Sequence, residues 1–392
     1  MSITVETNSM KILIDENIVH GRKLFEDYGE VTFKPGRNIK AEDLKNIDVL
    51  LVRSVTKVDE NLLRYAKKIK FVGSCTAGID HIDINYLRSK NIAFFSAPGS
   101  NKIAVSEYVL AVIMYYGKKY NFNFTDKVIG LVGMGNVGSY LYGLLKTLNL
   151  KVLICDPPLE KKGEHREFCD IEYICKNADI ISLHCSLIHD AKFSSYHLFN
   201  SNRLNNLKAN TILINASRGD VIDEGALLRE DIKNKFHLTL DVFENEPFIN
   251  KKILSYIDLF TPHIAGYSVE GKIKGSWMIY DDFCRYFGYD KKYEFCELLP
   301  TVKEDFFIDS EVNNKKIMQL IEFAYNVEKE SSDFSKTLCT TKSKNDIGKE
   351  FDLFRKNYAQ RREFSSICVR GLKKSQDINK LKKLGFTVLE ND

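Results

Sequence analysis

The feature that most constrains the fold of this chain is a short apolar segment followed at once by three closely spaced glycines. Residues 127–132 (Lys-Val-Ile-Gly-Leu-Val) have the composition of a buried strand, and residues 133–138 read Gly-Met-Gly-Asn-Val-Gly. Residues 139–148 then carry the apolar spacing of an amphipathic helix. A strand, a glycine turn and a helix in this order predict a unit of a doubly wound parallel sheet, with the helix N-terminus facing the phosphates of a dinucleotide.

Each glycine of this turn has a predicted task. Gly133 permits the tight turn, Gly135 lets the backbone approach a pyrophosphate, and Gly138 lets the helix pack on its strand. The helix begins near Asn136 and Val137, whose amide groups we therefore expect at the phosphates. These five residues form the predicted core of a cofactor site.

An acidic residue follows the next strand-like segment, residues 151–155. Asp156 stands 21 residues after Gly135, a spacing at which a carboxylate accepts hydrogen bonds from the adenosine ribose. The same carboxylate repels a 2′-phosphate, and the residues after it, Pro-Pro-Leu, supply no Arg to bind one. The pattern favours NAD over NADP. A methyltransferase or a cofactor-free doubly wound domain is the alternative, since methyltransferases also place an acidic residue on a ribose.

Strand-like runs alternate with longer amphipathic segments along most of the chain, which predicts parallel strands joined by crossover helices. The runs are residues 11–15, 49–53, 71–75 and 92–96 in a first series, and 127–132, 151–155, 179–185, 210–216, 237–242 and 259–261 in a second. A chain of 392 residues has room for two or three domains. We predict an α/β protein with a flavodoxin-like substrate domain (1–107 with 274–299), a Rossmann-type NAD domain (108–273) and a small C-terminal α+β domain (300–392).

The C-terminal part has its own pattern after residue 299. Two long helical stretches, at about 313–329 and 348–363, precede a strand at 364–369, a short helix and a strand at 386–389. The segment 331–349 is rich in Ser, Thr, Lys and Asp, and we expect it to be the least ordered part of the module.

Composition excludes several classes of protein. The 57 Lys and Arg against 53 Asp and Glu leave a net charge of +4, which gives no reason to expect nucleic acid. The longest apolar run, Tyr108–Tyr116, is well short of the ~20 residues of a membrane helix, and residues 1–10 lack the features of a signal peptide. A cytoplasmic location is therefore expected. None of the nine cysteines forms a C-x-x-C pair, so we expect reduced thiols and no metal site.

Three later segments place charged residues directly after strands of the second series. Arg218 can hold a substrate carboxylate through two parallel hydrogen bonds. His263 can take the proton of an alcohol as hydride leaves its carbon, and Glu246 can orient the imidazole and stabilise its protonated form. Taken singly, each has an ordinary alternative: a surface ion pair for Arg218, a solvated turn for Glu246, a satisfied strand-end residue for His263.

The order of glycine turn, Arg, Glu and His resembles the D-2-hydroxy-acid dehydrogenase family, which uses these three residue types in this order behind the same turn. The resemblance implies that Arg218 binds the substrate carboxylate, that Glu246 pairs with the histidine, and that His263 is the acid/base.

Further segments resemble one branch of that family, which oxidises 4-phospho-D-erythronate at C2 with NAD in vitamin B6 synthesis. They are residues 10–17, 52–58, 76–81, 97–101, 155–158, 263–267 and 355–363, so the likeness runs from about Met10 to the C-terminus. The resemblance implies substrate contacts at Ser54, Thr76 and Tyr267, and NAD contacts at Asp156, Cys185, Asp241 and Gly266. It also implies a homodimer formed through the C-terminal domain. Three residues depart from the expected pattern: Cys185 where a Thr is expected, Ser100 and Lys102.

The phosphate of such a substrate needs cations other than Arg218. Arg53 and Lys57 flank Ser54 after a strand of the first series, and Arg53 is our predicted phosphate contact. Arg355, Arg361 and Arg362 lie in the second long helical stretch of the C-terminal part, either as a solvated basic face or as phosphate ligands across a subunit interface.

Two other functions stay open. The chain could oxidise a different D-2-hydroxy acid, because Arg218 recognises only the shared carboxylate. It could also be a noncatalytic NAD-sensing scaffold that retains the same residues.

Overall fold

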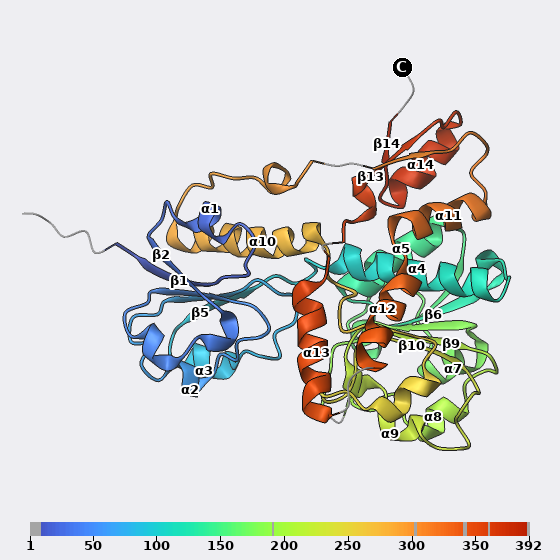
Figure 1. Ribbon diagram of the computed structural model, residues 1–392, viewed down its shortest axis with the longest axis horizontal. Coiled ribbons are helices and arrows are strands. Elements are labelled where there is room, and N and C mark those ends of the chain that lie inside the picture. Colours follow the sequence, from blue (N-terminus) through green and yellow to red (C-terminus); the bar gives the residue numbers. More distant parts are fainter. Residues whose placement is uncertain (1–8, 190–191, 302–303, 340–342, 360, 390–392) are drawn as a thin grey trace, which may run out of the picture. The chain divides into compact units, whose positions relative to one another are not determined.

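The computed structural model describes residues 9–189, 192–301, 304–339, 343–359 and 361–389 (Figure 1). The chain divides into two units, Met1–Asn101 with Ser268–Thr301 and Lys102–Tyr267 with Val302–Asp392. The predicted boundaries at 107/108 and 273/274 are wrong, because they fall inside the unbroken helices α4 (Lys102–Lys119) and α10 (Val269–Phe287). Residues 300–392, expected as a domain of their own, share a unit with the second sheet.

The first unit contains a five-stranded parallel sheet in the order β2-β1-β3-β4-β5. This is the strand order of a flavodoxin-like domain, the fold predicted for this part of the chain. Its strands are β1 (Lys11–Asp15), β2 (Glu30–Lys34), β3 (Val49–Val52), β4 (Phe71–Ser74) and β5 (Ala93–Ser96). Strand β2 was missed, because an edge strand half-exposed on both faces has no apolar run to mark it.

Alternation along β1 builds the two cores of this unit. Ile12 and Ile14 belong to the face covered by α10, with Phe283, whereas Leu13 belongs to the opposite face, with Leu87 of α3 (Ile84–Ser89). Successive side chains of a strand point to opposite faces, so a run that is apolar throughout needs cover on both sides. In Figure 1, α1 (Gly21–Phe25) and α10 cover one face of the sheet, and α2 (Glu60–Leu63) and α3 cover the other.

The second unit contains a six-stranded parallel sheet in the order β11-β10-β9-β8-β6-β7. Its strands, all at predicted places, are β6 (Val128–Val132), β7 (Lys151–Cys155), β8 (Ile180–Leu183), β9 (Ile212–Asn215), β10 (His237–Leu240) and β11 (Leu259–Phe260). The strand order reverses between β6 and β8, and doubly wound sheets bind ligands at the carboxyl ends of the strands beside such a reversal. The α/β class and the doubly wound sheet are confirmed.

Helix α4 is the central helix of this unit. Tyr108 and Tyr116 are fully buried, and their hydroxyl groups lie 2.8 and 3.0 Å from the hydroxyls of Thr261 and Thr239. The apolar run on this helix therefore serves packing in the protein core, and no helix within the described residues is long and apolar enough to cross a membrane. The other helices are α5 (Asn136–Thr147), α6 (Pro157–Lys161), α7 (Ile171–Asn177), α8 (Ser201–Asn205) and α9 (Glu224–Leu227).

The C-terminal module has a three-stranded parallel sheet in the order β12-β13-β14. Its elements are β12 (Glu304–Phe307), α11 (Asn314–Ala324), α12 (Val327–Cys339), α13 (Lys344–Asn357), β13 (Ile367–Arg370), α14 (Ser375–Lys383) and β14 (Thr387–Val388). The helix predicted at 313–329 is two helices, and α13 ends at Asn357, so Arg361 and Arg362 lie beyond it.

The prediction that 331–349 is the least ordered part is also wrong, except that residues 340–342 lie outside the described residues. The segment is helical because burial outweighs its polar composition: Ser331 is 6% exposed and its hydroxyl accepts a hydrogen bond from Phe260 N on β11. The ring of Phe334 lies 5.8 Å from that of Phe260 and 5.9 Å from that of Phe351 on α13. Helices α12 and α13 are thus part of the core beside the β11 edge.

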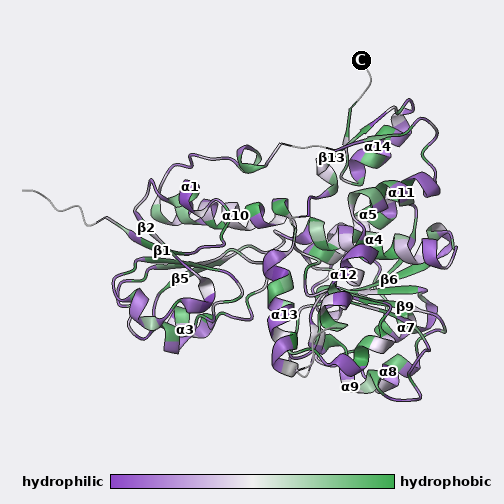
Figure 2. Cartoon of the chain, in the orientation of Figure 1, coloured by the Kyte–Doolittle hydropathy of each residue, from purple (hydrophilic) through white to green (hydrophobic). Residues whose placement is uncertain are grey.

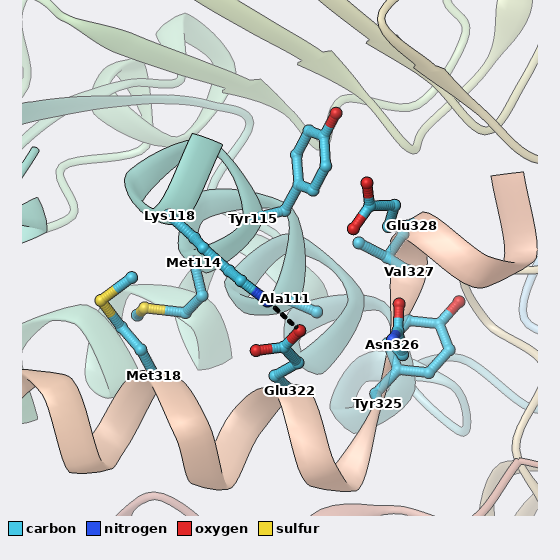
Figure 3. A pocket seen from close by; sticks show the side chains of 10 residues that line it. All are labelled: Ala111, Met114, Tyr115, Lys118, Met318, Glu322, Tyr325, Asn326, Val327 and Glu328. Carbon is cyan, nitrogen blue, oxygen red and sulfur yellow. Dashed lines mark hydrogen bonds and ion pairs between the residues drawn. The ribbon is translucent and has the colours of Figure 1, made fainter. Parts of the chain in front are cut away.

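Helix α11 packs on α4, and the two helices contribute to the core on the other face of the large sheet. Figure 3 shows the junction, where Lys118 Nζ donates to a Glu322 carboxylate oxygen at 2.6 Å. The pocket beside this ion pair has a volume of about 30 Å³, room for about one water and for no organic ligand. In Figure 2 the strands of the large sheet are mostly green, whereas the helices around it alternate between green and purple, as expected for helices that bury one face against the sheet.

Candidate active site

A pocket of about 1010 Å³ lies at the carboxyl ends of β6, β7 and β8. Among the residues predicted to bind the cofactor, Gly133, Gly135, Asp156 and Cys185 line it. The remaining predicted contacts, which are Asn136, Val137, Gly138, Asp241 and Gly266, are not part of its lining. The structure therefore gathers the glycine turn, the Asp156 carboxylate and the end of β8 around one cavity of a size suited to a dinucleotide.

The backbone of the glycine turn fits this use. Gly133 has φ +95, and a Cβ there would lie 2.6 Å from Cys185 N; a Cβ on Gly138 would lie 2.0 Å from Gly133 O. These two positions need glycine for the turn and for close packing, as predicted. A Cβ on Gly135 would meet no protein atom within 4 Å, so the backbone of this glycine is open to a ligand at the start of α5.

Asp156 has a second role that the sequence did not reveal. One oxygen accepts a hydrogen bond from Met134 N at 2.7 Å and the other from Leu159 N at 3.0 Å, so the carboxylate joins the glycine turn to α6. Arg166 lies nearby and donates to Ser139 Oγ at 3.0 Å, while its charge is balanced by Glu164. A carboxylate oxygen accepts more than one hydrogen bond, so Asp156 keeps capacity for a ribose.

Replacing Asp156 by Ala should lower the NAD-to-NADP ratio of kcat/KM by about tenfold or more, because like charges brought together cost several kcal/mol and the variant no longer repels a 2′-phosphate. Arg166 would add a nearby cation. Steady-state kinetics with both cofactors measure the ratio. Asp156→Asn is the matched variant, since it removes the charge but keeps an acceptor for Met134 or Leu159; an unchanged ratio in both variants would place Asp156 away from the ribose.

His184 lines the same pocket and was not predicted. Its Nε2 lies 2.9 Å from Ser182 Oγ, and its buried Nδ1 has no hydrogen-bond partner among the described residues. Burial lowers the pKa of His184 to about 4, so the ring is neutral near pH 7. The signal available in the sequence was its place directly after β8, the strand beside β6 in the sheet.

Arg218, Glu246 and His263 follow three neighbouring strands of this sheet. Asn215 at the end of β9 and Phe260 at the end of β11 are both register partners of Leu240 at the end of β10. Arg218 and His263 each come three residues after their strand, so the structure brings the predicted catalytic residues to one sheet edge.

Glu246 and His263 are directly hydrogen bonded. His263 Nδ1 lies 2.7 Å from one Glu246 oxygen, and the other oxygen accepts from Phe243 N at 2.9 Å. Burial opposes ionisation of Glu246, but the charge and hydrogen bond of His263, with the Phe243 amide, hold the pKa of this carboxyl below its usual value. Glu246 is thus a fixed anion at Nδ1, and this hydrogen bond leaves the other ring nitrogen, Nε2, pointing away from Glu246.

The backbone of His263 is held in an uncommon conformation, φ 56, by the buried Asp241. The Asp241 carboxylate accepts hydrogen bonds from Thr261 Oγ1, Ile264 N and Ala265 N at 2.7, 2.7 and 3.0 Å. Asp241 is 1% exposed, and burial raises its pKa. In this structure it braces the loop of His263, and its predicted contact with NAD stays a prediction.

The loop of Arg218 is built by Asn215. The Asn215 side chain accepts from Ser217 N and Oγ and donates to Arg218 O at 2.8 Å. A Cβ on Gly219 would lie 2.0 Å from the backbone of Phe243, so only glycine lets this loop approach the one that leads to Glu246. Sequence reasoning had singled out neither Asn215 nor Gly219 for this purpose.

The predicted substrate contacts of the first unit lie after β3 and β4. Arg53 Nε donates to the buried Asp15 at 3.1 Å, and Ser54 is exposed. Thr76 Oγ1 lies 2.9 Å from Ser74 Oγ and donates to Gly78 O at 3.2 Å. Asp15 orients Arg53, a link between strands β1 and β3 that could not be read from spacing.

Tyr267, the predicted substrate contact of the second unit, accepts a hydrogen bond from Arg355 Nη2 on α13 at 2.7 Å. Arg361 is 7% exposed and donates to the backbone oxygens of Ala104 and Ala265 at 2.8 and 2.9 Å. The predicted solvated basic face on one helix is therefore wrong for Arg361, which is buried past the end of α13.

No metal site was expected, and one group of potential ligands lies within the described part of the chain. His197, Asp223 and Glu244 offer atoms within 4.8 Å of one another. His197 Nε2 bonds Glu244 at 2.7 Å, and Asp223 caps α9 by accepting from Ala226 N. The nine cysteines are all unpaired, as expected, though Cys296 and Cys339 are exposed.

Comparison with known proteins bears directly on this site. Residues 114–265 match the family "D-isomer specific 2-hydroxyacid dehydrogenase, NAD binding domain", and residues 298–385 match a "Domain of unknown function (DUF3410)". The chain is 42% identical over 362 residues to the erythronate-4-phosphate dehydrogenase of Proteus mirabilis, covering 92% of this chain and 94% of that one. This chain belongs to the erythronate-4-phosphate dehydrogenases, within the D-2-hydroxyacid dehydrogenase family.

A second erythronate-4-phosphate dehydrogenase, from Escherichia coli, is 39% identical over 362 residues, with the same coverage of 92% and 94%. Among solved structures, the NAD-bound 3-phosphoglycerate dehydrogenase of Entamoeba histolytica has a TM-score of 0.60 and 25% identity, and covers 71% of this chain and 96% of its own. The D-lactate dehydrogenase of Aquifex aeolicus, solved with NAD and lactic acid, has a TM-score of 0.57 and 24% identity, with 71% and 95% covered, and supports the fold alone.

The predicted family and the NAD-binding domain are therefore confirmed.

Proposed function

We propose that this chain oxidises 4-phospho-D-erythronate at C2, with NAD, to 2-oxo-3-hydroxy-4-phosphobutanoate in vitamin B6 synthesis. The observation that carries the proposal is the Glu246–His263 pair at the same sheet edge as Arg218, in a chain that resembles erythronate-4-phosphate dehydrogenases over more than nine-tenths of its length. A noncatalytic scaffold has no need of a braced, hydrogen-bonded acid/base pair.

The glycine turn, the start of α5 and Asp156 would hold NAD in the 1010 Å³ pocket, as the open face of Gly135 allows. Bound there, NAD supplies an acceptor for the hydride that leaves C2. His263 Nε2 takes the proton of the C2 hydroxyl, so the C2–H and O–H bonds break and the C2=O bond forms. Glu246 stabilises the imidazolium that results, and Arg218 holds the carboxylate at C1.

A single assay separates this proposal from its rivals. Purified protein is given NAD and 4-phosphoerythronate, glycerate, 3-phosphoglycerate or lactate in parallel, and reduced nicotinamide is followed by absorbance. We expect the highest kcat/KM with 4-phosphoerythronate. Preference for another acid would assign a sister dehydrogenase, and NAD binding without turnover of any of them would favour the scaffold.

Arg53 remains our predicted phosphate contact in the first unit. Arg53→Ala should lower kcat/KM for 4-phosphoerythronate by an amount that corresponds to about 1.5–3 kcal/mol of lost transition-state binding, the scale of a hydrogen bond to a charged group. The value of kcat/KM for the dephosphorylated analogue should be nearly unaffected. Because Arg53 also pairs with the buried Asp15, thermal unfolding must be measured alongside. Lys57→Ala is the matched control, since Lys57 is exposed and pairs with Asp59. Equal losses on both substrates would assign Arg53 to the fold.

The proposal includes a homodimer formed through residues 300–392 and a cytoplasmic location. The C-terminal module exposes large apolar side chains, Phe307 at 69% and Phe323 at 45%, that a partner subunit could cover. Light scattering in solution measures the oligomeric state.

A further inference from the structure

Helix α13 of the C-terminal module brings an arginine to the loop of His263. Arg355 Nη2 donates to the hydroxyl of Tyr267, which stands four residues after His263 on that loop. The Arg355 guanidinium carbon lies 5.3 Å from the centre of the Tyr267 ring and 5.7 Å from that of Phe351. The cation is thus fixed on aromatic surfaces beside the acid/base pair.

The charge of Arg355 reaches that pair. Burial opposes ionisation of Glu246, and the groups that nevertheless lower its pKa include His263 and, more weakly, Arg355. Burial likewise opposes the charge of Arg355, while Tyr267 and Glu246 hold its pKa above the usual value. Arg355 therefore stays a cation within electrostatic range of the reacting group.

Part of the guanidinium is left without a protein partner. Arg355 Nε is buried and makes no hydrogen bond to any described residue. A buried charged donor without an acceptor is costly, and a guanidinium presents several N–H groups in a fork that matches a phosphate. Arg355 as a whole is half-buried, so part of its side chain is open to a small anion, whereas Arg361 is 7% exposed and donates to backbone oxygens.

The order of the elements matches the order of groups in the substrate. Arg218 follows β9, Glu246 follows β10 and His263 follows the edge strand β11, and α12 packs on β11 with α13 against α12. In 4-phosphoerythronate the carboxylate is C1, the reacting hydroxyl is on C2 and the phosphate is on C4. A substrate with its carboxylate at Arg218 and its C2 at His263 would therefore extend its phosphate past β11, the strand on which α12 packs with α13.

We propose that Arg355 binds the phosphate of the substrate, so that the module matched to a domain of unknown function supplies a specificity-determining residue to the active site of its own chain. This inference rests on the proposed function and deepens it. A doubly charged phosphate takes several donors, and the Arg355 guanidinium presents several N–H groups in one fork.

The test compares Arg355→Gln with the wild type on 4-phospho-D-erythronate and on D-erythronate, which lacks only the phosphate. We expect kcat/KM to fall roughly 10- to 100-fold for the phosphorylated substrate, as for one lost charge-assisted hydrogen bond, with little change for D-erythronate. Competitive inhibition by inorganic phosphate should weaken in the variant. Lys356→Gln is the matched control, because Lys356 is the next residue of α13 and is exposed; it should leave all three measurements unchanged.

Equal losses on the two substrates with unaltered phosphate inhibition would overturn the proposal. So would equal losses with a moved pH–rate profile, which would make Arg355 a positioning residue for Glu246. NAD binding, measured by titration, reports whether Arg355→Gln is folded. If it is not, Arg355→Lys serves instead: it keeps the charge without the fork, and a partial loss confined to the phosphorylated substrate supports the proposal, while a uniform loss overturns it.

Failure of the proposed function would look different. If the wild type prefers another acid to 4-phosphoerythronate, the substrate assignment falls, but inhibition by inorganic phosphate that weakens in Arg355→Gln and persists in Lys356→Gln still supports an anion site at Arg355. Phosphate inhibition that is the same in the wild type and in both variants would overturn the Arg355 site itself.

Discussion

Replacing His263 by Ala should lower kcat by about 10²–10⁴-fold, the usual effect of losing a positioned acid/base. Among the described residues, His263 is the only side chain that is hydrogen bonded to Glu246. The variant therefore has no second base paired with this carboxylate that could take the substrate proton. The glycine turn and Asp156 belong to other loops and are untouched, so the affinity for NAD should stay the same. Stopped-flow or steady-state rates give kcat, and NAD titration gives the affinity.

A variant that keeps more than about a tenth of wild-type kcat would contradict the assignment of His263, since even modest acid/base catalysis exceeds that factor. Loss of NAD affinity together with kcat would instead indicate that the loop had collapsed. The control is necessary because residue 263 has a φ of 56, a conformation that Ala rarely adopts. The substitution could therefore disturb the loop even though Asp241 still holds it.

Glu246→Gln should have an effect of similar size for a different reason. The amide retains a hydrogen bond to Nδ1 but no longer stabilises the imidazolium. It can also hold the ring in the wrong tautomer; the corresponding Asp-to-Asn change in a Ser-His-Asp triad lowers kcat by about 10⁴-fold for this reason. Oxidation needs the neutral imidazole, and the Glu246 anion favours the protonated one. The rising limb of the pH–rate profile should therefore move to lower pH in the variant, together with the fall in kcat.

The profile is measured as log kcat/KM against pH with saturating NAD. An unmoved limb would deny the pairing, whatever the loss of rate. The double variant Glu246→Gln with His263→Ala supplies a further check: residues that act as one unit are not additive, so it should be little slower than His263→Ala alone.

What the sequence by itself determined is the local chemistry. The glycine turn was readable because Gly133, Gly135 and Gly138 act through backbone within six residues, and the structure bears out the positive φ and the close packing. The central parallel strands were readable because strands buried on both faces are continuous apolar runs. The order of Arg218, Glu246 and His263 placed them at one sheet edge, because each follows a strand of the same parallel sheet.

Tertiary structure alone decided everything that depends on partners distant in sequence. Strands β2 and β12 are exposed at sheet edges and carry no apolar run. Helix α12 forms from a polar segment because Phe334 and Ser331 are buried beside β11. Asp241 braces the His263 loop through contacts 20 or more residues away, and Asp156 fastens the glycine turn 22 residues before it.

The placement of Arg355 is the clearest case. It lies 88 residues after Tyr267, in a helix whose composition is that of a solvated surface. Hydropathy measures how each residue partitions between water and an apolar interior. It therefore predicts that a charged side chain such as Arg355 is exposed to solvent, even where that side chain has a partner inside the protein. Only the packing of α12 on β11, and of α13 on α12, brings that side chain to Tyr267, on the loop that carries His263.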